Sequence, residues 1–120
     1  MAGIEMGDFN KPNESRTPPG TKVDMVKLGS IHVARATMEP GWKWSTNIKP
    51  IVKTDSCQVH HVGVVQSGRL QVKHEDGSEL ELTPGNVYVV EPGHDAWVIG
   101  DEPFVGYEFD ASAAQSFGKS

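Results

Sequence analysis

Closely spaced turns constrain this chain more than any other feature. From residue 22 onward, Gly, Pro, Asp or Ser interrupts the sequence at short intervals, and no stretch keeps the 3.6-residue apolar period of an amphipathic helix. The runs between the turns are candidate strands: 22–28, 31–38, 47–52, 58–66, 69–75, 79–82, 86–90, 96–99 and 104–109. Regular strand–turn–strand spacing is typical of a sandwich or barrel, so the sequence predicts an all-β fold.

The clearest local prediction is a hairpin around Asp76-Gly77. Apolar and polar residues alternate in 69–73 and again in 79–82, and Asp-Gly supplies the positive φ of a tight turn. Two further turns, at Pro84-Gly85 and Pro92-Gly93, bracket the apolar run 87–90.

The chain of 120 residues corresponds to one domain, which can bury about two thirds of the surface that the unfolded chain exposes. Residues 1–21 are polar, contain three prolines and show no strand or helix period. We therefore expect an N-terminal arm over 1–21, a β-barrel over 22–110 and a C-terminal tail over 111–120.

Charge and hydropathy restrict the partners. Lys and Arg number 11 against 16 Asp and Glu, a net charge of -5, which leaves no basic stripe for a phosphate backbone and predicts no nucleic-acid partner. No apolar run approaches the roughly 20 residues of a membrane-spanning helix, and residues 1–11 lack the layout of a secretory signal. We expect a cytoplasmic protein that acts on small molecules, with no membrane partner.

The run 59–66 is apolar on both faces of a strand, because Val59 and Val65 alternate with Val62 and Val64. Such a strand is buried on both sides. A small barrel leaves one face of its wall outside, so a second sheet, the arm or another subunit must cover it. We predict a homodimer.

Residues that bind transition metals gather in two segments, 55–61 and 94–95. In an extended strand Asp55, Cys57 and His61 share one face, whereas His60 points the other way. Cys57 is the one cysteine, so it forms no internal disulfide. With His94 from the second segment, a thiolate and two imidazoles suit zinc first, with iron, nickel, copper or manganese as alternatives. We predict a divalent metal site of Cys57, His61 and His94.

The two segments resemble the cupins, small β-barrels whose signature is two strand–turn–strand blocks. Gly68 matches the closing glycine of the first block. Counting back from it, His61 stands where the family's glutamate ligand stands, with Cys57 near the second histidine and Asp55 near the first. The resemblance spans about residues 33–109 and implies a single-domain jelly-roll barrel, a double-stranded β-helix.

The second cupin block is matched from Gly85 to Ala96, with two departures. Glu91 stands in the proline position and Ala96 in the histidine position, so His94, two residues earlier and of the same parity, is the substitute ligand. The amino-acid sequence of both blocks is similar to that of an uncharacterised bacterial subgroup of small cupin-domain proteins.

Aromatic residues near these segments are candidates for a ligand pocket. Trp42, Trp44 and Trp97 either wall an apolar or ring-shaped ligand or pack in a core or dimer interface. Asp55 and His60 join them as candidates for the pocket because they lie within the metal-ligand segment.

Three functions follow, because cupin activities range from dioxygenases, isomerases and lyases to binding modules, and fold alone does not choose. The first is a metal-dependent enzyme of oxygenase, isomerase or lyase type acting on a small organic molecule. The second is a non-catalytic small-molecule-binding or regulatory module. The third is a metal-free thiol site in which His61 activates Cys57. Tyr107 and Glu108 face opposite ways on the last strand, and one of them can point inward as an acid or hydrogen-bond donor.

Overall fold

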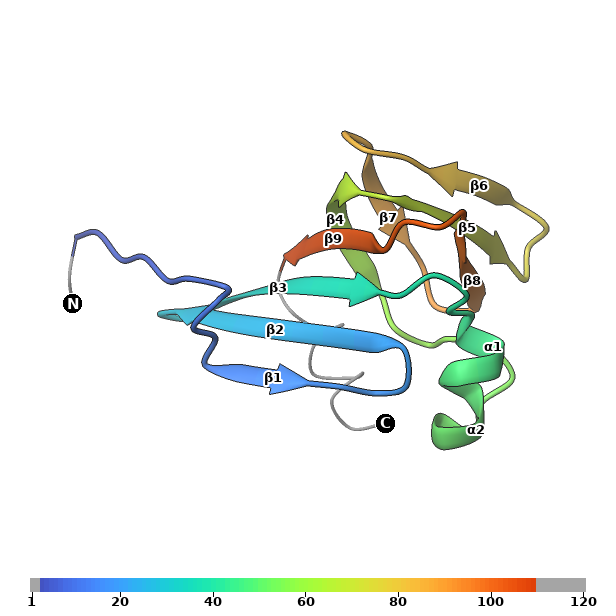
Figure 1. The fold of residues 1–120 in the computed structure, drawn as a ribbon, viewed down its shortest axis with the longest axis horizontal. Coiled ribbons are helices and arrows are strands. Elements are labelled where there is room, and N and C mark those ends of the chain that lie inside the picture. The colour runs from blue at the N-terminus through green and yellow to red at the C-terminus, as the bar shows by residue number, and fades with distance from the viewer. Residues whose placement is uncertain (1–2, 110–120) are drawn as a thin grey trace.

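The computed structural model describes residues 3–109, which form two antiparallel β-sheets that enclose one core (Figure 1). The larger sheet has the order β1-β2-β3-β9-β4-β7 and the smaller one β6-β5-β8. The elements are β1 (Glu14–Arg16), β2 (Thr21–Leu28), β3 (Ile31–Met38), α1 (Trp44–Asn47), α2 (Lys49–Val52), β4 (His61–Ser67), β5 (Arg69–His74), β6 (Glu79–Leu82), β7 (Val87–Val90), β8 (His94–Ile99) and β9 (Phe104–Phe109). The all-β prediction is confirmed.

Alternating side chains build the core, as the sequence pattern predicted. Residues of one parity in β5 and β8 are buried, among them Leu70, Val72, Ala96 and Val98. The predicted hairpin joins β5 to β6, with Leu70 opposite Leu82. Sheet-on-sheet packing of these faces is the main source of stability, because burying one aliphatic side chain contributes about 1.5–3 kcal/mol.

The backbone between β4 and β5 requires a glycine at position 68. Its φ is 77°, in the left-handed region, and a Cβ there would lie 2.2 Å from the Pro103 carbonyl oxygen. Any side chain would therefore collide with the turn before β9. The glycine that anchored the sequence comparison is thus required by the chain's own geometry.

The predicted strand at 47–52 is wrong, because this region forms the short helices α1 and α2. The Ser45 backbone N–H at the start of α1 donates to the Asp95 carboxylate at 3.1 Å, Pro50 lies in the first turn of α2, and Lys53 ends α2 with a φ of 60°. A helix of a single turn is too short to show a 3.6-residue period. A cap that comes from fifty residues away in the chain is also invisible in a local pattern.

The predicted arm over 1–21 contains a strand that the pattern did not predict. β1 pairs with β2, and the buried Asp24 accepts hydrogen bonds from Ser15 and Arg35 on this side of the sheet. Further toward the N-terminus, Phe9 stacks on Tyr107 at 5.4 Å between ring centroids. The arm therefore covers the outer face of the larger sheet near β2, β3 and β9. The predicted tail at 111–120 lies outside the described residues.

The apolar side chains that led to the homodimer prediction lie on the outer face of β4 and β7. Val62 and Val64 are half-buried, and their partners across the ladder, Val89 and Val87, are 60% and 77% exposed. The homodimer stays a prediction. Within residues 3–109, no helix is long and apolar enough to cross a membrane.

The two edges of the sandwich differ. At the β8 edge, the Val98 N–H donates to the Trp42 carbonyl at 3.0 Å, and isolated bridges join Lys43 to Trp97 and Cys57 to His94. The 42–57 segment thus connects the sheets there. At the opposite edge, β6 and β7 are the outermost strands of their sheets, and a turn at 83–86 links them (Figure 1).

Candidate metal centre

His61 begins β4 and points into the barrel, where it is 7% exposed. Its Nδ1 lies 2.8 Å from a carboxylate oxygen of the buried Glu108, and its Nε2 lies 4.0 Å from Cys57 Sγ. Because the carboxylate is an acceptor, Nδ1 carries the proton in this contact. The other ring nitrogen is therefore directed at the thiol.

His94 begins β8 and is positioned by the turn before it. Its Nδ1 donates to the Glu91 carbonyl oxygen at 2.8 Å. Cys57 lies opposite on the backbone, since its N–H donates to the His94 carbonyl at 2.7 Å and its carbonyl accepts from the Gly93 N–H at 2.7 Å. The Pro92-Gly93 turn thus holds both a histidine and the cysteine at one end of the barrel.

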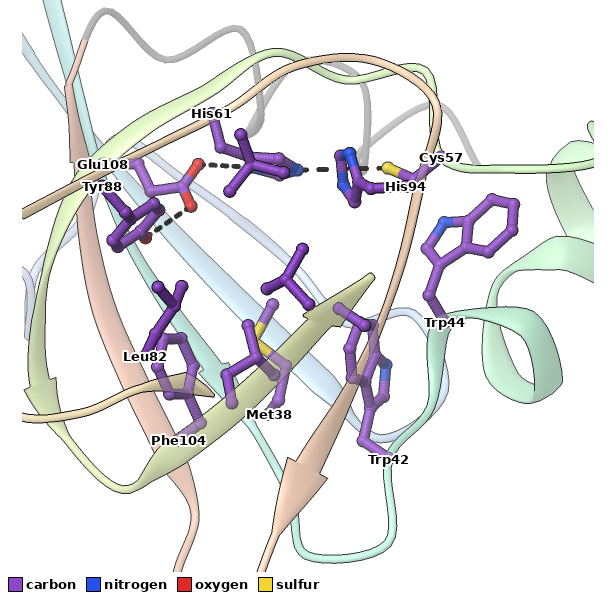
Figure 2. A pocket seen from close by; sticks show the side chains of 14 residues that line it. Met38, Trp42, Trp44, Cys57, His61, Leu82, Tyr88, His94, Phe104 and Glu108 are labelled. Carbon is purple, nitrogen blue, oxygen red and sulfur yellow. Dashed lines mark hydrogen bonds and ion pairs between the residues drawn. The ribbon is translucent and has the colours of Figure 1, made fainter. Parts of the chain in front are cut away.

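These three side chains form one buried group (Figure 2). One ligand atom from each of Cys57, His61 and His94 lies within 4.8 Å of the other two, and the imidazole centroids of the histidines are 5.0 Å apart. In a tetrahedral zinc site, a sulfur and a nitrogen ligand are separated by about 3.5 Å. The observed 4.0 Å between Cys57 and His61 is close to that separation, so the donor set fits a divalent ion after small side-chain rotations.

Glu108 and Tyr88 complete the buried polar network. The Tyr88 hydroxyl donates to the second carboxylate oxygen of Glu108 at 2.8 Å. Gly63 pairs with both residues across the sheet, and a Cβ on it would lie 2.8 Å from the Tyr88 hydroxyl, so the absent side chain makes room for the phenol. Of the two candidates on the last strand, Glu108 is the inward one. Tyr88 was missed, although it shares parity with the inward Val90.

The network changes the protonation of its members. Burial raises the pKa of Cys57, but hydrogen bonds and electrostatic interaction with His61 and His94 outweigh it and lower the pKa from 9.0 to about 6. Burial lowers the pKa of His61, but the charge of Glu108 and the contact with Cys57 raise it to about 10. Burial and the neighbouring carboxylate of Glu108 raise the pKa of Tyr88 above its ordinary value. Without a metal, the cluster favours a thiolate beside an imidazolium.

The cluster lines a cavity of about 30 Å³. A water needs about 10–15 Å³ of such volume, so the cavity has room for an ion and one or two waters. Trp42 and Trp44, predicted pocket residues, are buried and line it. The Trp42 Nε1 is the one buried side-chain nitrogen or oxygen without a hydrogen-bond partner among the described residues.

Three of the predicted pocket residues, Trp97, Asp55 and His60, do not line this cavity. Trp97 is of opposite parity to the buried His94, Ala96 and Val98, and its ring packs outside with the Lys43 ammonium 5.1 Å from its centroid. Asp55 is exposed because residues 55 and 56 bend and the strand period does not extend to them. His60 is also exposed, 3.4 Å from Glu91.

No family model and no curated protein matches the sequence. Several solved structures are similar to this chain in fold. A protein of unknown function from Rhizobium leguminosarum is 20% identical, with 90% of this chain and 96% of that one aligned at a TM-score of 0.64. A cupin-like protein from Thermotoga maritima is 16% identical, and the alignment covers 84% of this chain and 80% of that one at a TM-score of 0.54. This chain has the cupin fold. The structure of KdgF from a Halomonas species is also similar. It is 19% identical, and the alignment covers 81% of this chain and 86% of that one at a TM-score of 0.56.

The predicted jelly-roll architecture is therefore confirmed. Identities at this level identify the cupin fold and leave the function to be argued from the residues of the barrel.

Proposed function

We propose that this cupin barrel binds a divalent metal through Cys57, His61 and His94 and presents the open position of that metal to a small organic ligand. The proposal rests on the hydrogen bonds that the two histidine rings make. Each has its Nδ1 engaged by an acceptor, Glu108 for His61 and the Glu91 carbonyl for His94. Outer hydrogen bonds of this kind fix the tautomer and orientation of metal-binding histidines in proteins.

Each residue then has a distinct task. Cys57 contributes a thiolate, which the surrounding imidazoles already favour over the thiol. Glu108 holds His61 in place and accepts the Tyr88 hydrogen bond, so a proton-bearing hydroxyl and a carboxylate lie next to the centre. When bound, a divalent ion supplies Lewis acidity toward a ligand oxygen. Proton-holding groups beside such an ion favour isomerase or lyase chemistry on the ligand, with zinc as the metal.

The decisive test is metal binding by matched histidine variants. We expect cobalt(II), used as a spectroscopic substitute for zinc, to give a thiolate-to-metal absorption band with the wild-type protein. His61→Ala should abolish the band, because one of three protein ligands is lost. His60→Ala is the control, since this neighbouring histidine lies outside the cavity. Equal bands in both variants would overturn the proposed ligand set.

The alternative functions make different predictions. A binding module that uses its His/Cys cluster structurally would take up no cobalt and would return its ligand unchanged after long incubation. A metal-free thiol site would take up no cobalt, and its rapid alkylation, lost in His61→Ala, would be as fast before treatment with a chelator as after it.

A further inference from the structure

A groove of about 360 Å³ runs along the open edge of the sandwich, between β6 and β7. It adjoins the metal cavity, because the same four side chains line both: Val72, Leu82, Tyr88 and Val90. Its volume lies in the range of small-molecule sites, about 300–1,000 Å³. The groove is thus separated from the candidate centre by one layer of side chains.

Leu80 identifies the groove as an uncovered part of the interior. It lies opposite Val72 in the β5–β6 ladder, so both side chains project from the same, core-facing side of the sheet. Val72 is 8% exposed, but Leu80 is 68% exposed, because no strand of the facing sheet covers it. A core-facing leucine left open beside a cavity is the position that an apolar ligand covers.

The volumes decide where an organic ligand can lie. The metal cavity, at about 30 Å³, has room for an ion and one or two waters but not for the body of an organic ligand. The β8 edge is closed by the backbone contacts of Trp42, Lys43 and Cys57. The groove beside β6 and β7 is therefore a place into which the body of a ligand that reaches the cavity can extend.

The charges of the groove restrict the ligand further. Asp76, Glu79 and Glu91 lie along it, together with His74, whose Nε2 contacts the Pro92 carbonyl at 2.8 Å. These carboxylates repel an anionic body, and the aliphatic side chains offer it no compensating donor.

We propose that the groove between β6 and β7 binds the body of a largely aliphatic, non-anionic small molecule whose one donor atom reaches the cavity past Leu82 and Tyr88. That the donor atom of the ligand binds a metal rests on the proposed function. The path past Leu82 and Tyr88 and the chemical class of the ligand body do not depend on it. The two ideas can therefore fail separately.

The route is tested with Cys57 as a reporter, because it is the chain's one cysteine and lies inside the cavity. The full chain is treated with a chelator and labelled with iodoacetamide at a fixed pH of about 8, above the pKa of the thiol. The sulfur forms a bond to the reagent's methylene carbon, and iodide leaves. We expect Leu82→Ala to speed labelling several-fold and Leu82→Trp to slow it.

Leu70→Ala is the matched control. Leu70 and Leu82 are cross-strand partners, each is 7% exposed, and both line the cavity, but Leu70 does not line the groove. Acceleration in Leu82→Ala that Leu70→Ala does not show supports the route. Equal acceleration in both variants would mean that labelling follows general loosening of the core, and it would overturn the route.

The class of ligand is tested by protection of Cys57 with two probes of equal length and opposite charge. We expect hexylamine to slow labelling and hexanoate to have little effect. Leu80→Lys should remove the protection, whereas Ile31→Lys, at an exposed isoleucine outside the groove, should keep it. Stronger protection by hexanoate, or protection that survives Leu80→Lys, would overturn the proposed class, whatever the metal content of the protein.

Discussion

His60 and His61 are neighbours in sequence and have opposite environments. His61 is buried with its Nδ1 2.8 Å from the buried Glu108, whereas His60 lies 3.4 Å from Glu91 with both side chains about half exposed. The buried pair sets the direction of an imidazole, because few other positions satisfy both groups. The exposed pair is screened by solvent and directs little. The same two residue types therefore build a site on one face of the chain and a surface contact on the other.

The largest effect should come from breaking the two pairs in turn. We expect Glu108→Ala to destabilise the metal-free protein by about 3–5 kcal/mol, because it leaves His61 and Tyr88 buried without their acceptor. Glu91→Ala should cost at most about 1 kcal/mol. Chemical denaturation of both variants gives the comparison. Similar losses of unfolding free energy would show that the buried carboxylate has no special structural role.

A milder change at the same position sharpens the comparison toward metal binding. Glu108→Gln keeps the size of the side chain but weakens the acceptor that holds His61. We expect zinc affinity to fall about 10- to 100-fold, as is typical when an outer hydrogen-bond partner of a metal ligand is changed. Competition with a chelator measures the affinity. The matched Glu91→Gln variant removes charge beside His60 and should bind zinc as the wild type does.

The pH dependence of zinc affinity distinguishes the buried histidine from an exposed one. Metal binding must displace the proton of His61, whose pKa is raised to about 10, and below pH 6 also that of Cys57, whose pKa is lowered to about 6. Affinity should therefore rise about tenfold per pH unit between pH 6 and 9, and more steeply below pH 6. Proton release measured by titration in two buffers checks this. A flat profile from pH 7 to 9 would contradict the buried imidazolium.

Alkylation of Cys57 provides a smaller and more local readout. In the metal-free wild type, the rate should follow a thiol with an apparent pKa of about 6, and in His61→Gln this value should move up toward 9. His60→Gln should leave it unchanged. An apparent pKa near 9 in the wild type would indicate that His61 does not stabilise the thiolate.

Local patterns predicted the parts of the site that depend on strand parity. The period of two correctly turned His61 and His94 inward and His60 outward, and the Asp-Gly turn correctly predicted the β5–β6 hairpin. The same parity argues against Trp97 as a pocket residue, where nearness in sequence was misleading. Short-range chemistry is therefore a reliable guide wherever the chain is extended.

What the pattern did not predict depends on long-range register. Glu108 reaches His61 because β9 pairs with β4, and Tyr88 reaches Glu108 across Gly63. The first turn of α1 donates a hydrogen bond to Asp95, and the groove at Leu80 depends on where the facing sheet ends. None of these contacts is local in sequence, so they require the folded structure.

Elemental analysis of the untagged wild-type protein, purified without added metal and compared with the His61→Ala and His60→Ala variants, tests whether the cluster of Cys57, His61 and His94 holds a metal. We expect roughly one divalent ion per chain in the wild type and in His60→Ala, and loss of that ion in His61→Ala. A wild-type protein that is folded, metal-free and unable to take up added zinc would contradict it.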